Sequence, residues 1–232
     1  MPLWRNARHR FRVAAVVPES PDVVSVYVTG RHLDRLPARA GQFCFWRFPG
    51  HQHWWLANPF SLSAAPDGRG LRLTAKAVGG ASAALRDLPV GGRAFVEGPY
   101  GAFTSLHRTR PGVLLIAGGV GITPVRSMLE ERTSGDVVVL YRVRSEADAV
   151  LLDEVRQLVD QRGGRLHLLT GRTARSGVPP FAAGSLHRLV PDVTDRDVYV
   201  CGPPAMTAAV LAGLRELRVP ARQVHAERFG LA

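Results

Sequence analysis

The sequence has few cysteines, a single lysine and no long apolar run. Two cysteines, Cys44 and Cys201, cannot build a disulfide framework, a four-cysteine metal site or a cysteine-ligated iron–sulfur cluster. No apolar run approaches the roughly 20 residues that a membrane-spanning helix needs. The arginine-rich N-terminus also lacks the apolar core of a signal peptide. These absences predict a soluble, cytoplasmic protein or a fragment of one.

The chain also lacks a balance of charge, because its formal net charge is +11. Such a charge suits nucleic acid, an anionic membrane face or an anionic ligand. The arginines are scattered, however, and aromatic residues do not alternate with them, so no nucleic acid partner is expected. The eight histidines show no metal-ligand spacing, and the sequence predicts no metal site. Of the 30 lysine and arginine residues, Lys76 is the single lysine.

The first half of the sequence is typical of a β structure. Short segments rich in β-branched and aromatic residues alternate with turns such as Asp67-Gly68 and Gly91-Gly92. The predicted strands cover residues 11–17, 23–29, 42–48, 60–63, 71–78 and 93–97. A short helix fits between Ser82 and Leu88, with Ser82 as its cap. Strands at this spacing predict a sandwich or a barrel.

The second half alternates strands with helices. The predicted strands cover residues 112–117, 136–141, 165–170, 197–201 and 224–229, and the predicted helices cover residues 124–132, 147–161 and 204–217. This alternation predicts a parallel sheet with helices on both faces. A chain of 232 residues accommodates two small domains, and the change of pattern places them at residues 1–108 and 109–232.

One stretch joins a strand, a glycine turn and a helix. The apolar run Val113–Ala117 has the length of a buried parallel strand, and Gly119 and Gly121 follow it. Thr123 can cap the helix, and Pro124 suits its first position. Glycines let the backbone approach a ligand, and free amides at a helix start attract phosphate. The pattern Gly-x-Gly-x-x-Pro differs from the Rossmann fingerprint, and a ligand-free turn would use the same residue types.

Two segments of the first half carry further candidates. In Asn58-Pro-Phe-Ser61, the ring of Phe60 can stack on a planar cofactor and the Ser61 hydroxyl can bond its edge. A core phenylalanine and a strand serine are the alternative. In Lys76–Ser82, two glycines, a hydroxyl and a helix start form an anion nest to which Lys76 adds charge. A turn with a capped helix explains this segment except for its lysine.

Other candidates follow the strands of the second half, where ligands of open α/β sheets bind. Arg142, Arg144 and Arg172 suit a phosphate because the guanidinium fork matches its oxygens. A solvated basic loop is the alternative reading. Cys201 ends the fourth strand, where a merely buried thiol is the alternative. In the first half, Glu97–Gly101 is interpreted as a turn, with a ligand role left open.

Taken together and in order, these segments resemble the ferredoxin–NADP reductase superfamily over nearly the whole chain. The likeness is greatest to the soluble dehydrogenase portion of ferric reductases and NADPH oxidases. Asn58-Pro-Phe-Ser61 resembles the flavin motif His-Pro-Phe-Thr or His-Pro-Phe-Ser of that branch, except that Asn58 removes a cationic contact. The resemblance implies an antiparallel six-stranded barrel that holds FAD, followed by a five-stranded parallel sheet, with helices on both faces, that holds NAD(P)H.

The resemblance also implies residue roles. Phe60 would pack on the isoalloxazine, Phe229 would cover its other face, and the arginines would favour NADPH, with NADH as the alternative. The residues that position the reacting atoms would be Ser61, Cys201, Glu227 and Phe229. The cofactor-binding residues would be Asn58, Pro59, Phe60, Ser61, Lys76, Val78, Gly79, Gly80, Ala81, Ser82, Gly119, Gly121, Ile122, Thr123, Pro124, Arg142, Arg144, Arg172, Cys201, Gly202, Pro203, Met206 and Phe229.

The implied activity is hydride transfer from NADPH to FAD where the two domains meet. Electrons then pass to an acceptor such as haem, ferric iron, a quinone or oxygen. In the branch named above, the unit follows a haem-bearing membrane domain, so a membrane partner or an anionic membrane surface is a further expectation. A docking or regulatory module that keeps the fold without reducing flavin is the alternative, motivated by Asn58.

Overall fold

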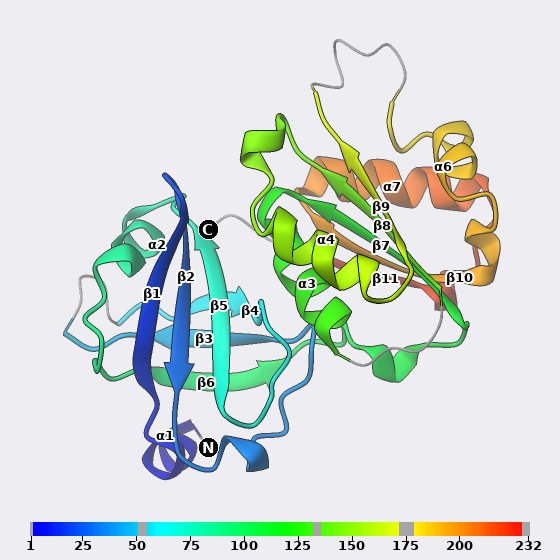
Figure 1. Ribbon diagram of the computed structural model, residues 1–232. Helices are drawn as coiled ribbons and strands as arrows, with labels where there is room; N and C mark the ends of the chain where they lie inside the picture. Colours follow the sequence, from blue (N-terminus) through cyan, green and yellow to red (C-terminus); the bar gives the residue numbers. More distant parts are fainter. Residues whose placement is uncertain (1, 51–54, 132–135, 172–178, 229–232) are drawn as a thin grey trace. The chain divides into compact units, whose positions relative to one another are not determined.

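The computed structural model describes the chain except for residues 1, 51–54, 132–135, 172–178 and 229–232 (Figure 1). It consists of two compact units, Met1–Thr104 and Ser105–Ala232, which we call the first and the second unit. The sequence places the change after residue 108. That each unit is a separate cofactor-binding domain stays a prediction.

The first unit is an antiparallel barrel of six strands. Its strands are β1 (Arg12–Ser20), β2 (Val23–Thr29), β3 (Phe43–Arg47), β4 (Asn58–Ser61), β5 (Gly70–Lys76) and β6 (Phe95–Tyr100). They form the sheets β1-β2-β5 and β4-β3-β6. Isolated bridges, Leu62 to Leu73 and Arg12 to Arg93, connect the two sheets at both edges. The barrel predicted by resemblance is therefore confirmed.

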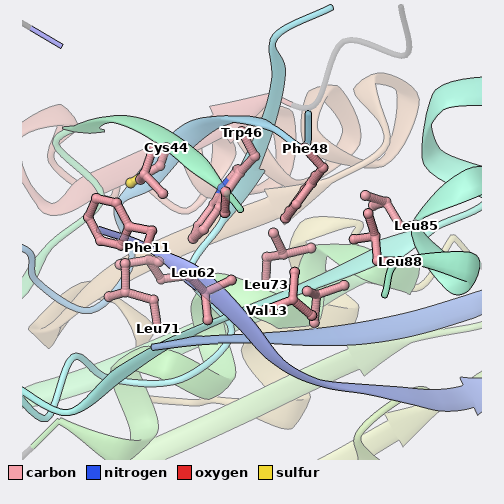
Figure 2. Packing of buried hydrophobic residues seen from close by; sticks show 14 of the residues in the cluster. Phe11, Val13, Cys44, Trp46, Phe48, Leu62, Leu71, Leu73, Leu85 and Leu88 are labelled. Atoms are coloured by element: carbon pink, nitrogen blue, oxygen red, sulfur yellow. The ribbon is translucent and has the colours of Figure 1, made fainter. Parts of the chain in front are cut away.

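Side-chain alternation builds the core of the barrel. In β3, Cys44 and Trp46 are buried, whereas Phe43, Phe45 and Arg47 are only partly covered. This period of two sends alternate residues to opposite faces of a strand. Figure 2 shows the buried residues of β3 among apolar side chains that come from β1, β5 and the segment after β4.

A short N-terminal helix, α1 (Pro2–His9), was not predicted and packs against β6. The side chain of Asn6 bonds the backbone of Val96 twice, donating to its carbonyl at 3.1 Å and accepting from its amide at 2.9 Å. Arg5 donates to the carbonyl of Gly98. The buried ring of His9 lies 2.8 Å from the carbonyl of Arg31. These contacts fix α1 at the end of the barrel where β1 begins (Figure 1).

The second unit is a five-stranded parallel sheet. Its strands are β7 (Gly112–Gly118), β8 (Val137–Arg142), β9 (Arg165–Leu169), β10 (Arg196–Gly202) and β11 (Val224–Arg228), in the order β11-β10-β7-β8-β9. Helices α3 (Ile122–Glu130) and α4 (Leu152–Asp160) pack together on one face, and α6 (Ala183–Leu189) and α7 (Pro204–Glu216) on the other (Figure 1). The central strands are buried on both faces, which explains their continuous apolar runs. The predicted parallel sheet is confirmed.

Several predicted helix boundaries were wrong. The helix predicted over 147–161 is a 3₁₀ turn (Glu146–Asp148) followed by α4, because Leu151 adopts a left-handed conformation with φ of 57°. The helix predicted over 82–88 is α2 (Gly80–Ala83) continued by a 3₁₀ turn. Helix α6 was not predicted. Among the residues that the structure describes, no helix is both long and apolar enough to cross a membrane.

Candidate functional site

Strand β4 presents the predicted flavin motif on two faces. Antiparallel pairing places Phe60 opposite Cys44, and Ser61 opposite Phe43. Phe60 is half-buried against the barrel core, and its carbonyl accepts a hydrogen bond from the Trp46 indole at 3.2 Å. Strand pairing and the packing of Phe60 therefore fix the backbone position of Ser61.

The hydroxyl of Ser61 has an unmet hydrogen-bonding capacity. Ser61 is only 2% exposed, and its Oγ has no hydrogen-bond partner among the described residues. Leaving a buried polar atom unpaired costs about 1–3 kcal/mol. A hydroxyl kept in this condition fits a site at which a bound group supplies the missing partner.

The first two residues of the motif make weaker contacts. Asn58 is half-buried, and its side-chain amide donates to the carbonyl of Leu56 at 3.4 Å. Pro59 is exposed. The Asn58 side chain carries no charge, so it can offer a phosphate hydrogen bonds but no ion pair.

An aromatic cluster on the same face as Ser61 was missed at the sequence level. Phe43, Phe45 and Tyr100 lie with their ring centroids 5.8–5.9 Å apart, in tilted and edge-on arrangements. Tyr100 is exposed and belongs to β6, so the Glu97–Gly101 segment read as a turn is mostly strand. The spacing Phe43-x-Phe45, at the period of a strand, was the available signal.

The turn after β5 is closed by its own serine. The Ser82 hydroxyl accepts hydrogen bonds from the amides of Val78 (3.0 Å) and Gly79 (3.2 Å), and donates to the Gly79 carbonyl. Helix α2 begins at Gly80 with Gly79 as its cap, so the prediction that Ser82 is the cap was wrong. These bonds occupy the amides of Val78 and Gly79 and the Ser82 hydroxyl. The amides that an anion could still bind are those of the first helical turn, at Gly80 and Ala81.

Lys76 has a structural partner. Its Nζ lies 3.0 Å from a carboxylate oxygen of Asp22, and this contact lowers the pKa of Asp22 below its usual value. Both side chains are substantially exposed. The ion pair accounts for a lysine in the position, and it leaves part of the ammonium accessible to an anion.

Two glycines of the turn after β7, Gly119 and Gly121, have different structural roles. Gly119 has φ of +54°, and a Cβ there would meet nothing within 4 Å. A Cβ on Gly121 would collide with the carbonyl oxygen of Cys201 and lie 2.7 Å from its carbonyl carbon. Gly119 therefore leaves open space beside the backbone, whereas Gly121 permits the start of α3 to approach the end of β10.

The start of α3 differs from the prediction. The helix begins at Ile122 with Gly121 as its cap, so Thr123 and Pro124 are its second and third residues and not the cap and first residue. Ile122, Thr123 and Pro124 are all buried. Their side chains pack in the protein, and a ligand at this helix start would meet backbone amides.

The end of β10 lies against the glycine turn. Cβ atoms added to Gly118 and Gly202 would lie 2.5 Å from the Met206 sulfur and 2.6 Å from its methyl group, respectively. The Cδ atom of Pro203 would lie 2.9 Å from the Cβ added to Gly118. The structure thus brings together the predicted Gly119–Pro124 and Cys201–Met206 segments.

Cys201 and Glu227 are paired across β10 and β11. Burial raises the pKa of the Cys201 thiol well above its ordinary value, so the thiol stays neutral at physiological pH. Burial also raises the pKa of Glu227 to about 7, and its Oε2 has no partner among the described residues. Cys201 is therefore a neutral, buried packing group, whereas Glu227 changes charge near neutral pH.

The predicted phosphate-binding arginines differ in their contacts. Arg142 donates to the carbonyls of Leu169 (3.2 Å), Thr170 (2.8 Å) and Gly171 (2.5 Å), which ties the end of β8 to the end of β9. Arg144 is exposed on the loop after β8. Two predicted residues, Arg172 and Phe229, lie outside the described residues. In the described part of the chain, no group of three histidine, cysteine or acidic residues is arranged to hold a metal ion.

Comparison with known proteins agrees with this architecture. Residues 115–211 match the oxidoreductase NAD-binding domain family, which defines the class of the second unit. The chain is 35% identical to the ferredoxin reductase component of 3-ketosteroid-9-alpha-monooxygenase from Mycobacterium tuberculosis over 204 residues, which cover 84% of the chain and 56% of the relative. It is 30% identical to the reductase component of propane 2-monooxygenase from Mycolicibacterium smegmatis, covering 95% of the chain and 67% of the relative.

A solved structure extends the likeness to both units. The flavohem-like FAD/NAD-binding domain of nitric oxide dioxygenase from Vibrio cholerae superposes with a TM-score of 0.76 at 25% identity, over 96% of the chain and 98% of that domain. The chain belongs to the ferredoxin–NADP reductase-like family. It spans 56% of the length of the first relative named above. The more specific likeness to ferric reductases and NADPH oxidases stays a prediction.

Proposed function

We propose that this chain is an electron-transfer flavoprotein that takes hydride from NADPH onto FAD and passes the electrons to an acceptor. The observation that carries the proposal is the buried, unpartnered hydroxyl of Ser61 on β4. It lies in a segment that resembles the family's flavin motif. When bound, FAD supplies the chemistry of accepting a hydride and releasing electrons singly.

In this proposal the first unit holds the flavin. Phe60 offers an aromatic surface and Ser61 offers its hydroxyl to the reacting edge of the ring. Residues Lys76–Ser82 receive the pyrophosphate through the open amides of α2 and the charge of Lys76. Asn58 stands where the flavin motif of the family has an arginine or a histidine, so it can hydrogen-bond a flavin phosphate but cannot form an ion pair with it. We therefore expect a lower flavin affinity than in relatives that carry arginine or histidine at this position.

The second unit holds the nicotinamide nucleotide. The backbone at Gly119 receives the phosphates, and the segment Cys201–Met206 lies beside the nicotinamide. The neutral thiol of Cys201 excludes water without acting as a nucleophile. Glu227 holds a proton below about pH 7 and releases it above, so it can donate a hydrogen bond to the nucleotide in one state only.

The unpartnered hydroxyl of Ser61 gives a prediction that separates function from stability. Ser61→Ala removes no hydrogen bond within the described residues and eliminates an unpaired buried hydroxyl, so the free energy of unfolding without FAD should not fall and should rise by up to about 1–3 kcal/mol. The rate of FAD reduction by NADPH should fall roughly 10- to 100-fold. Stopped-flow absorbance and chemical denaturation measure the two quantities. An unchanged reduction rate would exclude Ser61 from the reacting site.

The arginines give a prediction about nucleotide preference. Arg144 is exposed beyond β8, where it can pair with the 2′-phosphate that distinguishes NADPH from NADH. Arg144→Ala should raise KM for NADPH about tenfold, roughly the loss of one charge-assisted contact, and leave KM for NADH unchanged. Arg142→Ala is the matched comparison. Because it supports the backbone of residues 169–171, it should weaken both nucleotides.

The acceptor is proposed by analogy with the relatives. Two of the proteins compared are reductase components of monooxygenases, and a third is a flavohem-like domain. We therefore propose an oxygenase component or a haem-bearing domain as acceptor, with ferric iron, a quinone or oxygen as alternatives. The sequence resemblance suggests one specific acceptor of this kind, a haem-bearing membrane domain.

The direct test is anaerobic mixing of the purified protein with FAD and then NADPH. We expect FAD to bind and its visible absorption band to bleach on addition of NADPH. FAD that binds but does not bleach would reject the oxidoreductase proposal. If FAD does not bind even in excess, the chain would instead be a docking or regulatory module that keeps the fold.

A further inference from the structure

A second candidate binding site lies at the end of the barrel where α1 packs. A surface cavity of about 520 Å³ lies there, within the size range of small-molecule sites. Its lining includes three arginines, Arg10, Arg12 and Arg93, together with apolar groups such as Ala7 and Phe95. None of these residues belongs to the proposed flavin or nucleotide sites.

The charge of this cavity is not balanced within the described part of the protein. No acidic residue lines it, and none of its three arginines forms an ion pair with a described carboxylate. Arg12 donates one hydrogen bond, at 2.7 Å, to the carbonyl of Gly91. Like charges held close together repel, so an anion that enters the cavity is stabilised by all three.

The wall of the cavity is built by long-range contacts. Arg12 and Arg93 form the antiparallel bridge that connects β1 to the segment before β6, which brings residues far apart in the sequence side by side. Asn6, which also lines the cavity, is fixed by its two bonds to Val96. Arg10 directly follows α1 and has φ of 48°, a left-handed conformation that a residue other than glycine adopts at a cost of about 1–2 kcal/mol.

We propose that this cavity binds an organic phosphate, with the phosphate oxygens on Arg10, Arg12 and Arg93 and the apolar part of the ligand on Ala7 and Phe95. Guanidinium forks pair with phosphate oxygens in a bidentate manner, and three forks exceed what the two oxygens of one carboxylate can satisfy. The phosphate ester can come from a lipid headgroup or from a water-soluble metabolite, since both place a phosphate beside an apolar group.

The test is calorimetric titration of the full chain, with FAD and NADP⁺ in excess, using phenyl phosphate as the probe. Arg10→Gln/Arg12→Gln/Arg93→Gln should weaken binding at least about tenfold. The matched control changes Arg35, Arg39 and Arg69 to Gln, three exposed arginines of the first unit outside the cavity. Because it removes the same charge, it should weaken binding less than about twofold.

Further probes distinguish the two sources. A lipid source predicts that wild type and control bind phosphatidylglycerol vesicles and that the cavity variant does not. A water-soluble source predicts binding of phenyl phosphate without binding of vesicles. The single variant Arg93→Gln, at an exposed position, keeps the test valid if the triple variant does not fold, and should weaken binding about threefold. Binding of none of the probes, or equal losses in both triple variants, would overturn the proposal.

Discussion

Gly121→Ala should lower the free energy of unfolding of the second unit by about 3 kcal/mol and abolish nucleotide binding. The added Cβ would overlap the Cys201 carbonyl oxygen and lie 3.0 Å from the Gly202 Cα. Both are backbone atoms at the end of β10, an interior strand of the sheet, and they cannot move aside as a flexible side chain can. Strand β10 or helix α3 would have to shift, which would displace the segments proposed to hold the nucleotide.

The tryptophans allow this effect to be assigned to one unit. All four tryptophans, at positions 4, 46, 54 and 55, belong to the first unit. Far-UV circular dichroism should therefore report an earlier unfolding transition in Gly121→Ala, while the tryptophan fluorescence transition stays close to that of the wild type. Equal stability of the variant and the wild type by circular dichroism would contradict the packing described for Gly121.

Gly119→Ala is the matched control for the glycine turn. A Cβ at Gly119 meets no atom within 4 Å, so its cost is limited to the left-handed backbone, about 1–2 kcal/mol. If Gly119 provides the open backbone for the nucleotide phosphates, this variant should still fold at 25 °C and lose most of its NADPH affinity. Unchanged NADPH affinity would remove Gly119 from the nucleotide site.

Glu227→Gln should stabilise the protein at pH 8 by about 2 kcal/mol. Burial raises the pKa of Glu227 from 4.5 in the unfolded chain to about 7 in the folded protein. The folded state therefore binds a proton that the unfolded state has released between these values, and stability falls as pH rises through this window. The full shift corresponds to an upper limit of about 3 kcal/mol, and burying the amide of glutamine offsets part of it.

Chemical denaturation at pH 4.5, 6, 7 and 8 measures this effect. The wild type should lose stability between pH 4.5 and 7 relative to Glu227→Gln, and the difference should be constant above pH 8. Glu216→Gln, an exposed position on α7, is the control and should follow the wild type. Parallel stability curves for wild type and Glu227→Gln would show that the carboxyl titrates normally in the folded protein.

Local patterns predicted the fold more successfully than they predicted the limits of its elements. Alternation in the first half and apolar runs separated by helical segments in the second half were sufficient for the barrel and the parallel sheet. The break at Leu151 was not predicted, because a left-handed leucine has no local sequence signal. Helix α1 was missed because its position depends on contacts with Val96 and Gly98, which are distant in the sequence.

Candidate residues were easier to identify than the tasks that they perform. Gly119 and Gly121 look alike in the sequence, but Gly119 borders open space whereas Gly121 packs against the backbone of Cys201. Ser82 was predicted to cap its helix and instead closes the preceding turn. Arg142, predicted to bind phosphate, is committed to backbone carbonyls. In each case the neighbour that decides the role became visible only in three dimensions.

The sequence by itself determined the class of each unit, the family resemblance and the positions of the glycine turns, because periodicity and turn chemistry are local properties of the chain. Tertiary structure alone decided which polar atoms are buried without partners, as at Ser61 and Glu227, and which arginines share a cavity. Burial and charge proximity depend on strands that meet across long stretches of sequence. Arg12 and Arg93 are neighbours only because the barrel closes between them.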